Sequence, residues 1–112
     1  MHELSIAMGI VRIAEEQARK LGVEEIRAID LEIGTLSGVE ISSLDFAWPM
    51  AVENSVLRHA EKRIHIIPAK AKCLECGTEY DLENLFDPCP RCGSHFKDVF
   101  QGKEMRVKSI EI

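Results

Sequence analysis

Aromatic residues are scarce in this chain of 112 residues, which has one tryptophan, one tyrosine and four phenylalanines. Basic residues are also outnumbered, because 14 Lys+Arg stand against 19 Asp+Glu and leave a formal net charge of −5. A general nucleic-acid binder needs a concentrated basic face, often with aromatic side chains on which bases stack. The composition therefore argues against nucleic-acid binding and is compatible with protein partners.

Long apolar runs are missing as well. No stretch approaches the roughly 18 apolar residues that a membrane-spanning helix needs, so we expect no membrane association. The opening Met-His-Glu-Leu-Ser has no basic region followed by an apolar run, so we expect no signal peptide. A cytoplasmic location follows as an expectation, and cysteines there are better explained by metal than by disulfides.

What is present predicts a small globular fold, with 46% hydrophobic and 29% charged residues. Residues 4–21 have apolar side chains at three- and four-residue spacing, the pattern of an amphipathic helix. Gly22 suits the left-handed residue that ends a helix. We expect the buried stripe to comprise Leu4, Ala7, Met8, Val11, Ala14, Ala18 and Leu21.

A second helix is predicted to begin near Ser42 or Ser43, either of which could cap it. Pro49 should kink or delay this helix, because proline lacks the amide proton that the helix needs. The core-facing residues are expected to be Leu44, Ala47, Ala51 and Val52.

Three segments predict strands. Ile29, Leu31 and Ile33 alternate with polar residues, residues 64–67 form an apolar run that Pro68 ends, and residues 104–112 close the chain. Val107 and Ile110 fall on opposite parities, so the last strand needs a bulge or two-sided burial. The order of elements predicts an α/β (α+β) fold, a two-helix, three-strand domain of residues 1–68 plus 102–112 that is interrupted by a cysteine module of residues 69–101.

The cysteines form two pairs, Cys73-x2-Cys76 and Cys89-x2-Cys92, separated by twelve residues. Each pair can form a tight turn with both sulfurs pointing inward, and a glycine follows each turn. Four thiolates suit tetrahedral Zn(II) and leave no ligand position open, so the pattern predicts a structural zinc-ribbon module. Because so short a module buries little apolar surface, the metal should fold it. We expect Lys70, Lys72, Arg91 and Lys97 to offset the negative charge of the cluster.

Other interpretations of the cysteines stay open at this point. The two pairs also resemble the iron site of rubredoxin, although a rubredoxin is a short independent protein. A redox dithiol usually has a single Cys-x-x-Cys. His95 could replace one cysteine as a ligand, and a zinc-ribbon adaptor that binds other macromolecules would need no second metal.

The N-terminus offers a second ligand set. The Met1 amine, the His2 amide nitrogen and His2 Nδ1 can chelate one ion through fused five- and six-membered rings. Ni(II) and Cu(II) favour such square-planar nitrogen donors, and the fourth donor could be the Glu3 amide or carboxylate. A histidine at the second position is a weak signal when taken alone.

Several segments together resemble the HypA/HybF family of hydrogenase nickel-incorporation proteins. They are Met1-His2-Glu3 with Ser5, then Ile33-Gly34, Val39-Glu40 and Ser43-Leu44, the two cysteine pairs, and the ending Gln101-Gly102-Lys-Glu104-Met105-Arg106-Val-Lys108-Ser109-Ile-Glu. The resemblance covers essentially the whole chain.

The resemblance implies a nickel metallochaperone and not an enzyme. Carried over to this sequence, Met1, His2 and Glu3 would bind Ni(II) as transferred cargo, and Glu40 would lie behind that site. Structural Zn(II) would be bound by Cys73, Cys76, Cys89 and Cys92. The implied partners are a HypB-type GTPase and the NiFe-hydrogenase large subunit, with urease maturation proteins in some organisms.

Overall fold

The computed structural model describes residues 2–112, and these residues form two compact units. The first unit contains the chain up to Glu32 together with Val39–His65 and Arg106–Ile112. The second contains Ile33–Gly38 and Ile66–Met105. None of the helices within residues 2–112 is long and apolar enough to cross a membrane.

Helix α1 spans Glu3–Leu21, close to the predicted range, and ends where Gly22 adopts a φ of 69°. The buried residues are Ala7, Ile10, Ala14 and Ala18, so the core stripe is turned relative to the prediction. Leu4, Met8 and Leu21 were expected in the core but are exposed. Three alanines on the buried stripe leave room for a close approach to neighbouring elements, and Ile10 supplies the bulk.

Helix α2 spans Ile41–Val52 and begins earlier than predicted, with Glu40 and not a serine at the N-cap. Its buried residues recur every fourth position and are Leu44, Trp48 and Val52. Pro49 neither ends nor delays the helix. Its ring lies on the exposed side of the helix. The carbonyl group that loses its amide donor there can therefore be hydrated by water.

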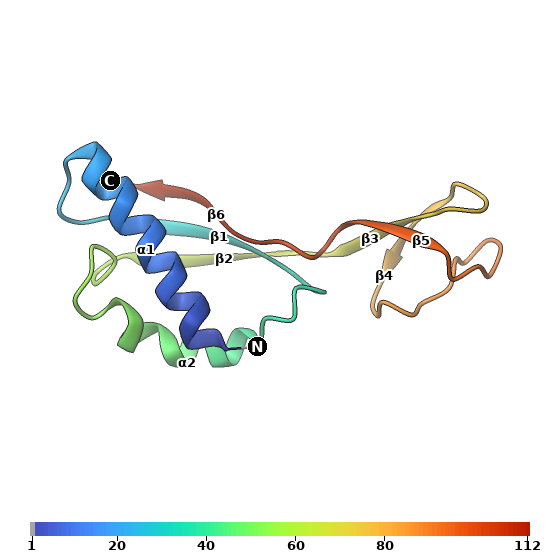
Figure 1. Cartoon of the computed structure of the whole chain (residues 1–112), viewed down its shortest axis with the longest axis horizontal. Helices are drawn as coiled ribbons and strands as arrows, with labels where there is room; N and C mark the ends of the chain where they lie inside the picture. The colour runs from blue at the N-terminus through green and yellow to red at the C-terminus, as the bar shows by residue number, and fades with distance from the viewer. Residues whose placement is uncertain (1) are drawn as a thin grey trace. The chain divides into compact units, whose positions relative to one another are not determined.

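The first sheet has the strand order β2-β1-β6, with β1 at Ala28–Gly34, β2 at Glu61–Ile67 and β6 at Met105–Glu111. Ile29, Leu31 and Ile33 are at most 1% exposed, as the alternation predicts. Helix α1 lies across these strands in Figure 1. The predicted architecture of two helices and three strands is therefore confirmed.

The opposite face of the first sheet is charged. Asp30 accepts hydrogen bonds from Arg63, His65 and Ser109, with the His65 Nε2 atom 2.8 Å from Asp30 Oδ1. The hydrogen bond with His65, followed by that with Arg63, holds the pKa of Asp30 well below its usual range. Arg106 pairs with Glu32 on the same face. Since Arg106 and Ser109 are three residues apart yet share a face, the alternation of β6 is interrupted, as the sequence required.

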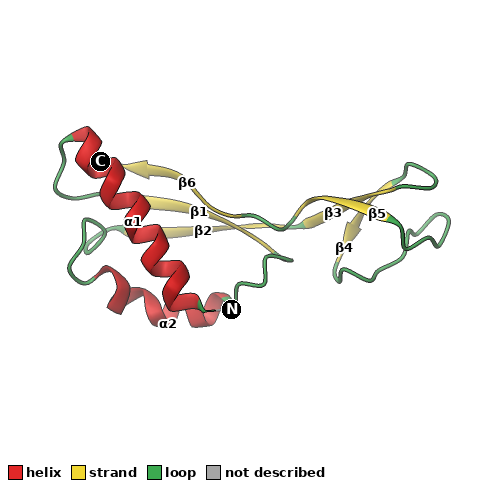
Figure 2. Ribbon diagram, viewed as in Figure 1, coloured by secondary structure: helices red, strands yellow, loops and turns green. Residues whose placement is uncertain are grey.

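The second unit has a sheet of its own, with the order β4-β3-β5 (Figure 2). Strand β3 spans Ala69–Cys73 and pairs antiparallel with both β4, Glu79–Leu82, and β5, Lys97–Gln101. These three strands were not predicted. Leu36, from the segment after β1, packs against the core of this unit. The core residues are Ala69, Ala71, Cys73, Tyr80, Leu82 and Cys89.

Two glycines allow close backbone contact in the second unit. A Cβ atom on Gly34 would lie 2.0 Å from the Gly102 carbonyl oxygen, and one on Gly102 would lie 2.4 Å from Ala69 Cα. Gly102 also has a φ of 110°, which L residues rarely adopt. The Leu36 amide donates to the Gly102 carbonyl at 2.7 Å. Glycine at positions 34 and 102 is therefore required by packing and not only by flexibility.

Candidate metal centres

The two cysteine pairs form matching turns. The Gly77 amide donates to the Cys73 carbonyl at 2.9 Å, and the Gly93 amide donates to the Cys89 carbonyl at 2.8 Å. Both glycines have positive φ angles, 78° and 76°. Each first cysteine also donates its amide to a carbonyl five residues on, that of Thr78 or Ser94. The same hydrogen-bond pattern therefore directs both pairs of sulfurs toward one point.

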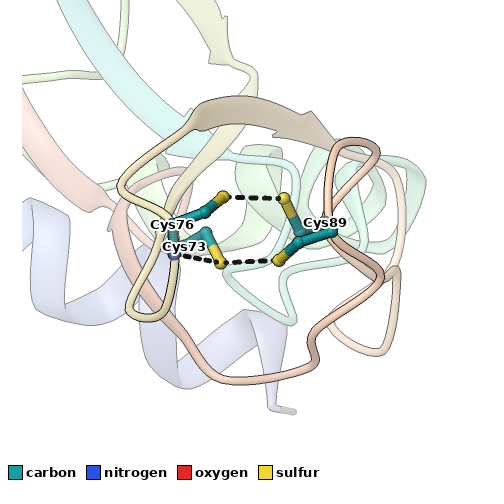
Figure 3. A group of neighbouring side chains, drawn as sticks. Cys73, Cys76 and Cys89 are labelled. Carbon is teal, nitrogen blue, oxygen red and sulfur yellow. Dashed lines mark hydrogen bonds between the residues drawn. The ribbon is translucent and has the colours of Figure 1, made fainter.

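The four sulfur atoms lie within 4.8 Å of one another and form the one cluster of three or more potential metal ligands within residues 2–112. Figure 3 shows the side chains of Cys73, Cys76 and Cys89 pointing toward each other. The sulfur of Cys73 is 3.5 Å from that of Cys92, far longer than a disulfide bond of about 2.05 Å. Zn–S bonds of about 2.3 Å in a tetrahedron place sulfurs about 3.8 Å apart. The observed spacing fits structural zinc.

Hydrogen bonds lower the pKa of two of these thiols and so favour the thiolate form that binds metal. The Cys76 amide, 3.4 Å from the Cys73 sulfur, lowers the pKa of Cys73. Hydrogen bonding from the Thr78 hydroxyl and amide lowers the pKa of Cys76 to about 6. At Cys92 the Ser94 amide favours the thiolate, yet the neighbouring Cys73 sulfur and burial raise the pKa to about 12. Four thiolates this close repel one another, so full ionisation requires a cation between them.

One neighbour of the cluster was not singled out from the sequence. Tyr80 is 8% exposed, and its hydroxyl is buried without a hydrogen-bond partner among residues 2–112. Burial and the nearby cysteine charges raise the pKa of Tyr80. Lys97, which was expected to offset the cluster charge, donates hydrogen bonds to the carbonyls of Leu85 and Asp87 at 2.7 and 2.6 Å.

The predicted nickel ligands lie at the N-terminus. Met1 lies outside the described residues. His2 is exposed and extended, with φ −94° and ψ 92°, and its side chain makes no capping hydrogen bond. The first backbone hydrogen bond of α1 is donated by the Ile6 amide to the His2 carbonyl at 3.1 Å. The amides of His2 and Glu3 thus precede the helical hydrogen-bond ladder.

Glu3 and Glu40 meet in the first unit. The Glu40 amide donates to Glu3 Oε2 at 3.3 Å, although the two residues are 37 apart in sequence. Glu40 Oε1 in turn accepts a hydrogen bond from the Ser42 hydroxyl at 3.1 Å. One carboxylate oxygen of Glu3 is therefore tied to the start of α2, and the other oxygen has no such contact with residues 2–112.

The remaining histidines have other surroundings. His59 Nδ1 lies 3.0 Å from Glu25 Oε1, and His65 contacts Asp30. His95 is exposed and is not a member of the four-sulfur cluster. The structure therefore brings together the four cysteines and leaves His95 aside.

Comparisons with known proteins agree along the full chain. The sequence profile of the family described as "Hydrogenase/urease nickel incorporation, metallochaperone, hypA" matches residues 1–112. "Hydrogenase maturation factor HypA" of Parabacteroides distasonis is 47% identical over 112 residues, which cover 100% of this chain and 97% of that protein. The protein of the same name from Azotobacter vinelandii is 42% identical over 112 residues, covering 100% of this chain and 99% of that one.

A solved structure has the same fold. The solution structure of the Ni metallochaperone HypA from Helicobacter pylori matches with a TM-score of 0.72 at 27% identity, and the match covers 100% of this chain and 97% of that chain. A second match, to a structure described as the solution structure of HypA protein, has a TM-score of 0.74 at 28% identity and covers 100% and 96% of the two chains.

Proposed function

Because this chain belongs to the HypA family of hydrogenase and urease nickel-incorporation metallochaperones, we propose that it binds Ni(II) at Met1, His2 and Glu3 and passes the ion to a maturation partner. The observation that carries this proposal is the state of His2, which is exposed, extended and free of any capping hydrogen bond. Its imidazole and amide are therefore available as ligands without loss of a contact in the fold.

The position of the ligands at the start of α1 suits reversible binding. Ni(II) displaces the amide protons of nitrogen ligands, and the amides of His2 and Glu3 donate no hydrogen bond within the helix. Metal binding would therefore break none of the hydrogen bonds of α1. Proton release on binding predicts that nickel affinity falls as the pH falls.

Glu3 would tune the site from a fixed position. Its Oε2 atom is held by the Glu40 amide, so the carboxylate is oriented before nickel arrives. The fourth nickel donor would be either the Glu3 amide or its second carboxylate oxygen. Because all donors come from the first three residues, donor atoms of a partner could replace them one at a time. We propose transfer of the ion and no catalysed reaction.

The four cysteines would hold a structural Zn(II) ion. The matching turns at Cys73-Cys76 and Cys89-Cys92 support this assignment, since four sulfurs complete a tetrahedron and leave no position for a substrate. We assign nickel binding to residues 1–68 plus 102–112 and zinc binding to residues 69–101. A HypB-type GTPase and the NiFe-hydrogenase large subunit, or urease maturation proteins, would be the partners, in the cytoplasm.

Nickel titration of the untagged, zinc-loaded protein tests the proposal. We expect calorimetry to show one Ni(II) per chain and a square-planar d–d absorption spectrum. His2→Gln should abolish both signals with zinc content unchanged, because glutamine cannot supply the imidazole nitrogen. His59→Gln is the matched control, since His59 is another exposed histidine, and it should bind nickel like the parent.

Equal nickel binding by the parent and His2→Gln would contradict the N-terminal site. Absence of nickel binding by either protein would do the same. Both results would favour a zinc-ribbon adaptor that has no nickel role.

A further inference from the structure

Strand β5 forms one edge of the second sheet, where the order is β4-β3-β5. Its inner side pairs with β3, with Ala71 opposite Val99 and Lys72 opposite Asp98. No other strand within residues 2–112 pairs with its outer side. The edge of a sheet presents a row of main-chain donors and acceptors that an extended segment can use.

A groove with a volume of about 410 Å³ follows this edge. Lys97, Asp98 and Val99 all line it. Because side chains of consecutive strand residues point to opposite faces, three consecutive lining residues place the groove along the strand edge and not over one face. Strand β5 has five residues, and at about 3.3 Å per residue it offers a track of about 17 Å.

The opposite wall of the groove includes Leu85 and Phe86. Lys97 holds this wall in place through its hydrogen bonds to the carbonyls of Leu85 and Asp87. The Asp87 carboxylate accepts hydrogen bonds from the Asn84 and Glu83 amides at 3.0 and 2.9 Å. These bonds hold the pKa of Asp87 below its ordinary value. The groove is therefore formed before any ligand binds.

The groove is lined by both apolar and polar side chains, and most of the polar ones are basic. Phe86 is 82% exposed and Leu85 is 45% exposed, so both offer apolar contact area. His95 and Lys103 also line the groove, and neither has an ion-pair or hydrogen-bond partner within residues 2–112. Asp98 is the one carboxylate in the lining, and its cross-strand neighbour is Lys72. An acidic occupant suits this balance of charges.

We propose that this groove is a docking site for an extended acidic segment of a partner protein. The segment would add to β5 as an antiparallel or parallel strand, with its apolar side chains against Phe86 and its carboxylates near Lys103. This site lies within the second unit and uses no nickel ligand. The docking proposal can therefore be tested independently of nickel binding.

Heteronuclear NMR of the zinc-loaded full chain tests the proposal. The probe is an acetylated heptapeptide that alternates valine and glutamate, and the matched peptide alternates valine and lysine. We expect the acidic peptide alone to shift the amide signals of Lys97–Gln101 and to slow their exchange with solvent. Lys103→Glu should weaken its binding about fivefold, because an attraction becomes a repulsion.

Two further variants distinguish local charge from net charge. Lys20→Glu makes the same charge change on α1 in the first unit and should leave the affinity unchanged. Asp98→Asn removes the one carboxylate of the groove and should tighten binding about threefold. Zinc content, measured in every variant, confirms that the second unit is folded.

Three results would overturn the proposal. One is that neither peptide shifts the β5 signals. A second is that both peptides shift them equally, which would show attraction without charge selectivity. The third is a shift of the same signals with protein concentration in the absence of peptide, since the occupant would then be a second copy of this chain.

Discussion

Asp30 shows how a single residue can organise one face of a sheet. Its carboxylate accepts hydrogen bonds from Arg63, His65 and Ser109, which come from the two strands beside β1. The partners hold its pKa below the ordinary value. A depressed folded-state pKa means that the carboxylate stabilises the fold above the unfolded-state pKa of about 3.9, and that this contribution is lost as the pH falls below it.

We therefore expect Asp30→Asn to lower the urea midpoint of unfolding at neutral pH. The difference between parent and variant should shrink as the pH falls below about 4, because the carboxyl group is then protonated first in the unfolded chain and, at lower pH, in the folded protein as well. Far-ultraviolet circular dichroism across a pH series measures both midpoints. Asp45→Asn is a control, since Asp45 has a single ion-pair partner, Lys62, among the described residues. A difference of equal size there would contradict a special role for Asp30.

At the scale of single residues, the sequence was most informative where spacing has chemical meaning. The two cysteine pairs and their following glycines predict the matching turns, because each turn is completed within six residues. The hydrogen bonds of Lys97 could not be predicted, for the opposite reason. Its partners, the carbonyls of Leu85 and Asp87, lie ten or more positions away, and no local pattern shows a backbone carbonyl that lacks a donor.

Helix α1 illustrates what periodicity fixes and what it leaves open. The spacing of apolar residues predicts the helix and its extent, but α1 has apolar residues on more than one side. The choice between Met8 and Ile10 as a core residue depends on the surface against which the helix packs. The short strands of the second unit were missed because residues 69–73 read as alternating alanine and lysine, a weak strand signal. Only burial of the alanines against Tyr80 and Leu82 makes that alternation significant.

Substitution of two glycines by alanine should have opposite effects on stability. Gly102→Ala should destabilise the protein by about 2 kcal/mol or more, because a φ of 110° and the contact with Ala69 both exclude a Cβ atom. Gly9→Ala, inside α1, should stabilise it by about 0.5 to 1 kcal/mol, since no described atom beyond the neighbouring residues and the local helix backbone lies within 4 Å of the added carbon. Thermal unfolding measures both changes. A loss of stability in Gly9→Ala would show that α1 has a closer neighbour than described.

On the scale of the whole molecule, the two units depend on different sources of stability. Both helices and the large aliphatic residues Ile29 and Leu31 lie within the first unit. The second unit has a small core that includes two of the cysteines. A core of this size needs a metal or an equivalent cross-link.

Removal of zinc should therefore unfold one unit and spare the other. With a strong chelator present, we expect the helical signal in the far ultraviolet to persist, because α1 and α2 belong to the first unit. Amide exchange in β3, β4 and β5 should become fast, and added zinc should reverse it. Loss of the helical signal together with the zinc would show that the units fold as one cooperative structure.

The burial of Tyr80 beside the cysteines has a practical consequence. This residue is the one tyrosine of the chain and lies in the core beside Cys73 and Cys89, whereas the one tryptophan, Trp48, lies on α2 in the first unit. Each unit therefore has its own intrinsic fluorophore. Tyrosine emission would report metal loading of the cysteine cluster, and tryptophan emission would report changes in the helical unit, so one unlabelled sample could follow both units separately.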